Sequence, residues 1–359
     1  MALPDANQLL SQAFRLEQLG CFAGALEGYR KALETHPKPA VAVIKYFRLL
    51  REVGASPAND LKLVWQLDPG GNYWETDWVR YLLSGLNCTE IIDCRYSEFH
   101  NNAIIVDCGI DSSRSGYYFE LLKRGFRFAL VHLSDEHYTD DCTAYSFANF
   151  VIRNYWSRAH APDRNILSVP LGVMNGFRVS GLRTTSDRRY IWAFAGNIGK
   201  SSRLEMAKAL SSVSDGFLHH TDAVNPAAAR DHTHPNAPLA IADYADVMSN
   251  AVFAPCPGGW ENLDSFRVCE ALEAGCIPIV EKRPGFDYFR HIFGEHPMMT
   301  VESWTEAREL INRLRENETA LNARRLVCAN WWKSHKADLV IRIREAVLQS
   351  FRSLPESDG

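Results

Sequence analysis

A hydroxyl, a cation and a carboxylate stand close together in the C-terminal half of the sequence. Ser265, Arg267 and Glu270 follow a loop rich in glycine and proline, which contains Pro255 and Gly258. If a helix begins here, its free N–H groups and its positive dipole end attract an anion. Arg267 can then pair with a diphosphate, Ser265 can cap the helix or bond a phosphate oxygen, and Glu270 can accept both hydroxyls of a ribose. The pattern predicts a nucleotide-binding site.

A second glycine turn, at Gly196, leads into two further cations, Lys200 and Arg203. An apolar strand, a glycine turn and a cationic helix start form a phosphate cradle, and this one would face the diphosphate from the other side. Two alternatives remain open. Arg203 could be a solvated cation at a helix start, and Arg267 could form an ordinary surface ion pair with Glu270 along one helix.

Three side chains that can accept a proton, Asp135, Glu136 and His137, follow an apolar run. Transfer of a group to a hydroxyl needs a base that takes the hydroxyl proton. Glu136 is preferred over Asp135 because its longer side chain reaches further from a strand end, and His137 would also serve at neutral pH. The rivals are Asp107 and Asp111 at the end of the preceding strand, and any of these acids could instead cap a helix.

Two series of alternating strand and helix patterns must position these groups. Apolar runs bounded by short loops alternate with helical patterns, which predicts right-handed βαβ units and parallel sheets. The sequence therefore predicts two Rossmann-like α/β domains that bind ligands beyond the carboxyl ends of their strands. The first series has strands at 104–106 and 128–133 with a helix at 115–123; the second has strands at 191–195, 251–254 and 277–280 with a helix at 264–274, before a helical tail at 304–351.

The N-terminal segment is predicted to be a small helical unit. One tetratricopeptide repeat matches the residues Gly20, Phe22, Ala25, Tyr29, Ala32 and Pro37. In such a repeat, small Gly20 and Ala25 would let two helices approach closely, and Pro37 would end the second helix. A degenerate second unit would end near 67–69, before a breaker cluster. The segment would bind a protein partner, associate with itself, or cap the next domain. The predicted domains are 1–69, 70–185 and 186–359.

The composition is that of an ordinary globular protein, with 46% hydrophobic and 23% charged residues in a chain of 359. The net charge of -4 gives no basic field for nucleic acid, so none is expected as a partner. The nine cysteines include no C-x-x-C pair, which favours reduced thiols over a metal site or disulfides. We find neither a signal peptide pattern nor an apolar run of the ~18 residues a membrane span needs. We therefore expect a cytoplasmic protein, at most peripheral to a membrane.

The stretch 244–280 resembles the exostosin-like glycosyltransferases. Members carry an apolar strand ending in proline, a glycine-containing loop, and then Ser-Phe-Arg, Glu-Ala-Leu and Gly-Cys-Ile-Pro. The corresponding residues here are Phe253, Pro255, Gly258, Ser265-Phe266-Arg267, Glu270-Ala271-Leu272 and Gly275-Cys276-Ile277-Pro278. A weaker similarity extends over roughly 125–300 and leaves out the helical N-terminus. Within it, Arg153 and Asn154 are candidates for positioning the acceptor or the donor, with a helical surface role as the alternative.

The resemblance implies a GT-B fold, in which two Rossmann-like domains face a cleft, and a nucleotide-sugar donor, usually a UDP-sugar. It also implies a glycan or other hydroxyl acceptor and inversion at the anomeric carbon. Metal-dependent glycosyltransferases of the GT-A class hold their donor cation with an Asp-x-Asp motif. No such motif occurs in this sequence. Fixed cations would neutralise the leaving diphosphate instead, so we expect neither a metal ion nor a cofactor.

Two other functions remain open. The chain could be a non-catalytic scaffold that binds partners through its helical segment. It could also be a fucosyltransferase-like enzyme that uses a GDP-sugar, because the sequence from Ala271 to Pro278 recurs loosely there. The intact Arg267, Glu270 and glycine–proline loop favour an enzyme, and the Ser-Phe-Arg triplet favours the exostosin side.

Overall fold

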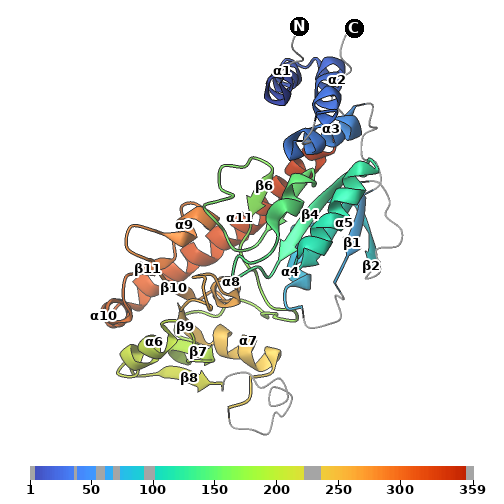
Figure 1. Cartoon of the computed structure of the whole chain (residues 1–359). Helices are drawn as coiled ribbons and strands as arrows, with labels where there is room; N and C mark the ends of the chain where they lie inside the picture. Colours follow the sequence, from blue (N-terminus) through green and yellow to red (C-terminus); the bar gives the residue numbers. More distant parts are fainter. Residues whose placement is uncertain are drawn as a thin grey trace.

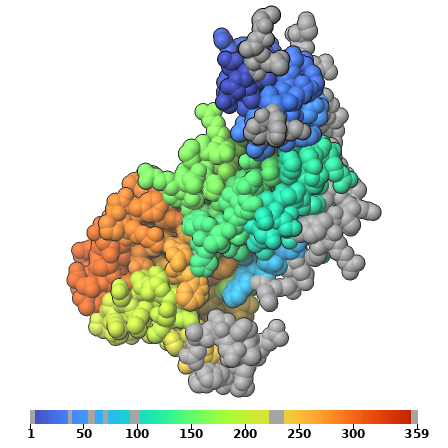
Figure 2. Space-filling view, in the orientation of Figure 1, coloured from blue at the N-terminus to red at the C-terminus, as the bar shows by residue number. Residues whose placement is uncertain are grey.

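The computed structural model of the chain describes residues 5–35, 39–53, 61–67, 73–92, 102–221 and 236–352. They form two α/β lobes, each built on a parallel sheet, and a group of N-terminal helices at one end of the molecule (Figures 1 and 2). This confirms the predicted class, an α/β protein of two parallel sheets preceded by helices. In this described part, no helix combines the length and the apolarity that crossing a bilayer requires.

The first lobe contains a parallel sheet of six strands among the described residues. Its strands are buried along their length where helices cover both faces, as in β4, whose six residues are all buried. In spatial order they are β2 (Cys88–Ile92), β1 (Leu61–Trp65), β3 (Ala103–Cys108), β4 (Phe128–Leu133), β5 (Phe150–Arg153) and β6 (Ile166–Ser168). The helices of this lobe are α4 (Thr76–Leu82) and α5 (Ser112–Lys123), with a short 3-10 helix at Cys142–Ser146.

The second lobe contains a parallel sheet of five strands in the described part. In spatial order they are β11 (Met299–Val301), β10 (Ile277–Glu281), β9 (Ala251–Cys256), β7 (Tyr190–Gly196) and β8 (Gly216–His220). The helices that follow these strands are α6 (Arg203–Leu210), α7 (Ile241–Ser249), α8 (Phe266–Glu273), α9 (Tyr288–Phe293), α10 (Trp304–Leu314) and α11 (Glu318–Ser350).

The last helix, α11, belongs to both lobes. It leaves the second sheet and runs alongside the first, ending near the N-terminal helices (Figure 1). Trp332 stacks on Trp78 of α4 with ring centroids 5.9 Å apart, and the Ser350 carbonyl accepts a hydrogen bond from Asn149 Nδ2 at 3.1 Å. The predicted third domain, 186–359, therefore covers the second sheet and also a helix that packs on the first.

The N-terminal helices are α1 (Ala6–Gln18), α2 (Phe22–Leu33) and α3 (Ala40–Glu52). Contrary to the prediction, two helices do not approach closely at Gly20. This glycine has φ +77°, a left-handed conformation that favours glycine, at the turn between α1 and α2. The close approach is at Gly28, where an added Cβ would lie 2.8 Å from the Cβ of Ala13. Pro37 lies outside the described residues.

The expectation of a helical segment continuing to 67–69 was wrong. Residues Leu61–Trp65 form β1, which lies between β2 and β3 inside the first sheet. A short apolar run such as Leu-Lys-Leu-Val-Trp suits a buried strand or a buried helix equally, and here pairing with two neighbouring strands decides. The predicted boundary at 69 and 70 falls outside the described residues.

Candidate functional site

The predicted anion site lies at the N-terminus of α8. Ser265 occupies the N-cap position, is 8% exposed and makes no capping bond; its hydroxyl has no hydrogen-bond partner among the described residues. Arg267, in the first turn, is 9% exposed. Its Nη2 donates to the Ala195 carbonyl at 2.6 Å, while its Nε has no partner in the described chain. Buried polar atoms are rarely left unpaired in folded proteins, so these two donors are available to an anionic ligand at this helix end.

Two further cations surround this helix end. Arg203 is buried, with Nε donating to the Gly258 carbonyl at 3.0 Å and Nη1 donating to the Asn197 carbonyl at 3.1 Å. The Lys200 ammonium lies 4.3 Å from the ring centroid of Trp260. Burial and the nearby Arg267 lower the pKa of Arg203 to about 10, and burial with both arginines lowers the pKa of Lys200. These cations repel one another, so a bound anion would stabilise the cluster.

The same geometry corrects one alternative for Arg203. It is not a solvated cation at a helix start, because it fastens the glycine–proline loop to the turn that follows β7. Glycine is required at position 196, in that turn, for a different reason. Gly196 has φ +147°, and an added Cβ would lie 2.9 Å from Arg267 Nη2. Any larger residue would therefore displace the guanidinium from the anion site.

Glu270 is 1% exposed and lies one turn behind Arg267. Its two oxygens accept hydrogen bonds from the Met174 N–H at 3.2 Å and from the Tyr244 hydroxyl at 2.9 Å. Burial raises the pKa of its carboxyl to about 7. The alternative of a surface ion pair with Arg267 was wrong, because both side chains are buried and each has other partners. Its predicted contact with a ribose remains a prediction, and a carboxylate with two acceptor bonds keeps capacity for more.

Two other residues of the predicted loop have structural positions. Pro255 lies within β9, where it pairs with Ile279 of β10. Gly258 is buried, and an added Cβ would lie 2.9 Å from the Asn262 carbonyl oxygen. Asp264, which ends the loop, is 1% exposed and accepts a hydrogen bond from the Leu171 N–H at 3.2 Å. The loop is therefore held closely against the segment that joins the two lobes.

The three predicted proton acceptors have different surroundings. Asp135 is 4% exposed, forms an ion pair with Arg153 Nη2 at 3.2 Å and accepts a hydrogen bond from Thr139 N–H at 2.9 Å. Glu136 reaches across to the second lobe, where its Oε1 accepts from the Trp260 N–H at 2.6 Å. His137 is exposed. Which of them accepts a proton remains a prediction, although Asp135 and Glu136 already bind other groups of the protein.

Arg153 and Asn154 do not lie on a helical surface. Arg153 ends β5, is fully buried and donates from Nη1 to the Tyr145 hydroxyl at 3.0 Å, besides its ion pair with Asp135. Asn154 is 2% exposed, and its Oδ1 accepts from the Ser134 N–H at 3.0 Å. Both side chains therefore order the carboxyl ends of β4 and β5, and their predicted contact with substrate remains untested.

The rival acids at the preceding strand end serve as helix supports. Asp111 caps α5 by accepting a hydrogen bond from the Arg114 N–H at 2.8 Å. Asp107 is 1% exposed, accepts from the Tyr118 hydroxyl at 2.5 Å and pairs with Arg114 Nη1 at 3.3 Å. The helix-cap alternative that the sequence left open thus holds for Asp111.

No sequence pattern pointed to Glu75, which is 3% exposed at the N-cap position of α4. Its Oε1 accepts hydrogen bonds from Ser134 Oγ at 3.3 Å and Asn154 Nδ2 at 3.4 Å. Burial raises the pKa of this carboxyl above its ordinary value. The neighbouring Trp74 is 58% exposed and stacks on Phe266, the first residue of α8. No local motif surrounds Glu75, because its partners come from distant segments.

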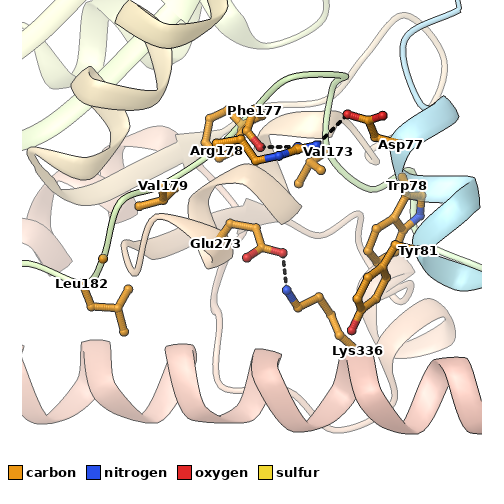
Figure 3. A pocket seen from close by; sticks show the side chains of 11 residues that line it. Asp77, Trp78, Tyr81, Val173, Phe177, Arg178, Val179, Leu182, Glu273 and Lys336 are labelled. Atoms are coloured by element: carbon orange, nitrogen blue, oxygen red, sulfur yellow. Dashed lines mark hydrogen bonds and ion pairs between the residues drawn. The ribbon is translucent and has the colours of Figure 1, made fainter. Parts of the chain in front are cut away.

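A cavity of about 380 Å³ lies elsewhere, between α4, the segment joining the lobes, the C-terminal end of α8, and α11 (Figure 3). Its charged side chains already pair with one another. Arg178 Nη2 lies 2.8 Å from Asp77 Oδ2, and Lys336 pairs with Glu273. Apolar side chains such as Val179 and Leu182 line the rest. The cavity therefore lacks the uncompensated cations of the α8 site.

Residues 115–282 match the family model of the Exostosin GT47 domain. No curated protein matches the chain. Among solved structures, an O-GlcNAc transferase mutant from Thermobaculum terrenum is similar with a TM-score of 0.51 at 9% identity, covering 99% of this chain and 86% of that one. This likeness, together with the two facing parallel-sheet lobes, confirms the GT-B fold.

Two solved complexes show weaker likeness. The Anabaena protein HepE in complex with UDP-glucose has a TM-score of 0.48 at 12% identity, covering 80% of this chain and 98% of that one. The T4 phage enzyme BGT in complex with its UDP-glucose substrate has a TM-score of 0.45 at 13% identity, covering 80% and 99%.

Proposed function

The chain is a glycosyltransferase with an exostosin GT47 domain at residues 115–282, and we propose that its donor is a UDP-sugar and its acceptor a glycan hydroxyl. One observation carries this proposal. The hydroxyl of Ser265 and Nε of Arg267 are buried at the N-terminus of α8 and have no partner among the described residues. A phosphate oxygen would satisfy both atoms and would also meet the positive end of the helix.

The leaving group of such a transfer is a nucleoside diphosphate, and its charge must be neutralised as the glycosidic bond breaks. Arg267 from α8, and Arg203 from the start of α6 with Lys200 just before it, converge around the glycine–proline loop. Fixed cations in a partly buried site stabilise developing negative charge without reorganisation. We therefore propose that no metal ion is needed. Glu270, behind Arg267, would contact the ribose.

Inversion requires the acceptor to attack the anomeric carbon from the face opposite the diphosphate. The second lobe is committed to the donor, so the acceptor would enter from the first lobe. That lobe offers the carboxyl ends of β4 and β5, which is the edge where ligands bind in open parallel sheets. The choice of uridine as the base follows the exostosin resemblance, and a GDP-sugar is the alternative.

Donor choice can be tested with a thermal-shift panel of UDP-, GDP-, ADP- and CMP-sugars, followed by calorimetry on the best ligand. A ligand at ~100 times its Kd should stabilise the fold by about 2.7 kcal/mol. Release of the nucleoside diphosphate should continue in EDTA. Loss of turnover in EDTA that manganese restores would contradict metal independence. Failure of every nucleotide-sugar to bind would leave the non-catalytic scaffold as the better function.

We also propose that α1 and α2 bind a protein partner or a second copy of the chain. Phe14 of α1 is 49% exposed and Leu19, directly after α1, is 67% exposed, so apolar surface is available there. The helices stand at the end of the molecule, away from α8 (Figure 1). An interface at this end would leave the donor site open.

A further inference from the structure

We infer that Glu75 is the general base that takes the proton from the acceptor hydroxyl. The inference rests on the glycosyl transfer proposed above. Glu75 lies in the first lobe, which the donor leaves free, and it comes from a segment that precedes the matched domain.

The carboxylate of Glu75 lies over the carboxyl edge of the first sheet. Ser134 directly follows β4 and Asn154 directly follows β5, and both donate a hydrogen bond to Glu75 Oε1. Oε2 accepts from the Trp74 N–H at 3.2 Å. These neutral donors fix the carboxylate where parallel sheets bind their ligands. Fixed orientation is what a proton acceptor needs.

The adjacent Trp74 shows that this edge faces the donor site. Its indole stacks on the ring of Phe266 with centroids 6.4 Å apart and planes at 8°. Phe266 is the first residue of α8 and lies between the two candidate phosphate ligands, Ser265 and Arg267. The segment that carries Glu75 therefore contacts the very turn at which the diphosphate is proposed to bind. An acceptor beside Trp74 would be next to both the base and the donor.

The other carboxylates of this region are already committed. Glu136 accepts hydrogen bonds from the Trp260 and Glu261 N–H groups, which hold its charge against the loop of the second lobe. Asp135 pairs with Arg153 inside the first lobe. Both carboxylates are therefore held in place by other groups of the protein. Glu75 has no ion pair among the described residues: its hydrogen bonds come from the neutral Trp74 N–H, Ser134 Oγ and Asn154 Nδ2, and burial raises its pKa above the ordinary value.

The chemical step is balanced by these groups alone. The acceptor oxygen forms a bond to the anomeric carbon while the bond from that carbon to the phosphate oxygen breaks. The electron pair of the broken bond leaves with the nucleoside diphosphate, which the cations around α8 stabilise. The proton of the acceptor hydroxyl passes to the Glu75 carboxylate and later to solvent.

The test uses the full chain and the UDP-sugar that binds best, with water as the acceptor. Glu75→Gln should slow UDP release by ~10²–10⁴-fold while the donor Kd measured by calorimetry stays within about twofold of the parent. Glu120→Gln, on the exposed side of α5, is the matched control and should release UDP at the parent rate. Azide needs no proton removed, so it should restore UDP release to Glu75→Ala and yield a glycosyl azide.

Each outcome has a distinct meaning. A Glu75→Gln variant that releases UDP at the parent rate overturns the inference, and so does a Glu75→Ala variant that azide does not rescue although it binds donor normally. A parent that binds donor but releases no UDP with water or azide also overturns it. A parent that binds no UDP-sugar overturns the proposed function instead.

Discussion

The carboxylate of Glu136 in the first lobe accepts a 2.6 Å hydrogen bond from the backbone N–H of Trp260 in the second lobe. The Glu261 N–H donates to the same oxygen at 3.2 Å. This contact joins the glycine–proline loop, which carries the proposed donor site, to the end of β4, where the sequence predicted the catalytic base. It gives Glu136 a role in shaping the donor site.

Replacing Glu136 should therefore affect donor binding first. Glu136→Ala removes both acceptor bonds, and hydrogen bonds to a charged group are worth about 1.5–3 kcal/mol, so the donor Kd should rise roughly tenfold or more. Glu136→Gln keeps one acceptor oxygen and should fall between Glu136→Ala and the parent. Calorimetry with a UDP-sugar measures both. An unchanged Kd combined with a large loss of turnover would instead restore Glu136 as the catalytic base.

Replacing Arg267 should weaken donor binding more strongly. Arg267→Ala removes the guanidinium that holds an unpaired Nε at the α8 N-terminus, and a lost charge-assisted contact to phosphate should raise the donor Kd by roughly 10- to 100-fold. Arg290→Ala on α9, whose side chain is 59% exposed, is the matched control. Far-UV circular dichroism should report a folded protein for both. Parent-like affinity in Arg267→Ala would remove it from the donor site.

The free energy of unfolding should depend on pH through the titration of Glu270. Burial raises the pKa of the Glu270 carboxyl to about 7, although Tyr244, Arg267 and the Met174 N–H act to lower it. The folded state therefore holds the proton more tightly than the unfolded state. The contribution of Glu270 is fully present below the unfolded pKa near 4.5 and is lost as pH rises through about 7, by roughly 3 kcal/mol. Between pH 4.5 and 8, Glu270→Gln should lose less unfolding free energy than the parent.

Urea unfolding at both pH values measures this difference. Glu309→Gln, at an exposed position of α10, should keep the pH dependence of the parent. Asp264 titrates over the same range, because burial also raises its pKa to about 7, and it should leave a residual slope in Glu270→Gln. Identical slopes in Glu270→Gln and the parent would show that Glu270 titrates normally.

Deleting residues 1–34 should spare donor binding, whereas a deletion that reaches Trp65 should not yield folded protein. The short deletion removes α1 and α2 but keeps α3, whose Arg51 Nη1 donates to the Phe147 carbonyl at 2.9 Å in the first lobe. The long deletion takes β1 out of the interior of the sheet. Calorimetry tests donor binding, and light scattering tests whether the helices mediate self-association. An insoluble short deletion would make them a structural cap.

Local sequence patterns predicted most of the fold and the donor side of the candidate site. The bounds of β4 and the start of α6 at Arg203 followed from apolar runs and a glycine turn, and the helix at 264–274 was found at Phe266–Glu273. The three cations and Ser265 lie next to such turns, so the same sequence patterns predicted that these residues cluster. Proximity to a turn gave their position but not their partners, as Arg203 shows by binding two carbonyl groups.

What the sequence could not give depends on contacts between distant segments. β1 is a strand because β2 and β3 flank it, and its five residues alone do not decide between strand and helix. Glu75 lies beside Ser134 and Asn154, which are far away along the chain. Arg153 is buried because β5 lies inside the sheet, although its charge suggested a surface. In each case tertiary pairing outweighs local preference.

The path of α11 limits how the lobes can rotate. The chain passes between the lobes once through the segment near Leu182 and again through this helix of 33 residues. Two crossings define a hinge axis, since rotation about any other line would stretch one of them. The cavity of about 380 Å³ is lined by Leu182 from the first crossing and Lys336 from the second, so it lies along that axis (Figure 3). A small rotation about that axis would change its volume little, so a movement of the lobes would leave this cavity nearly unchanged.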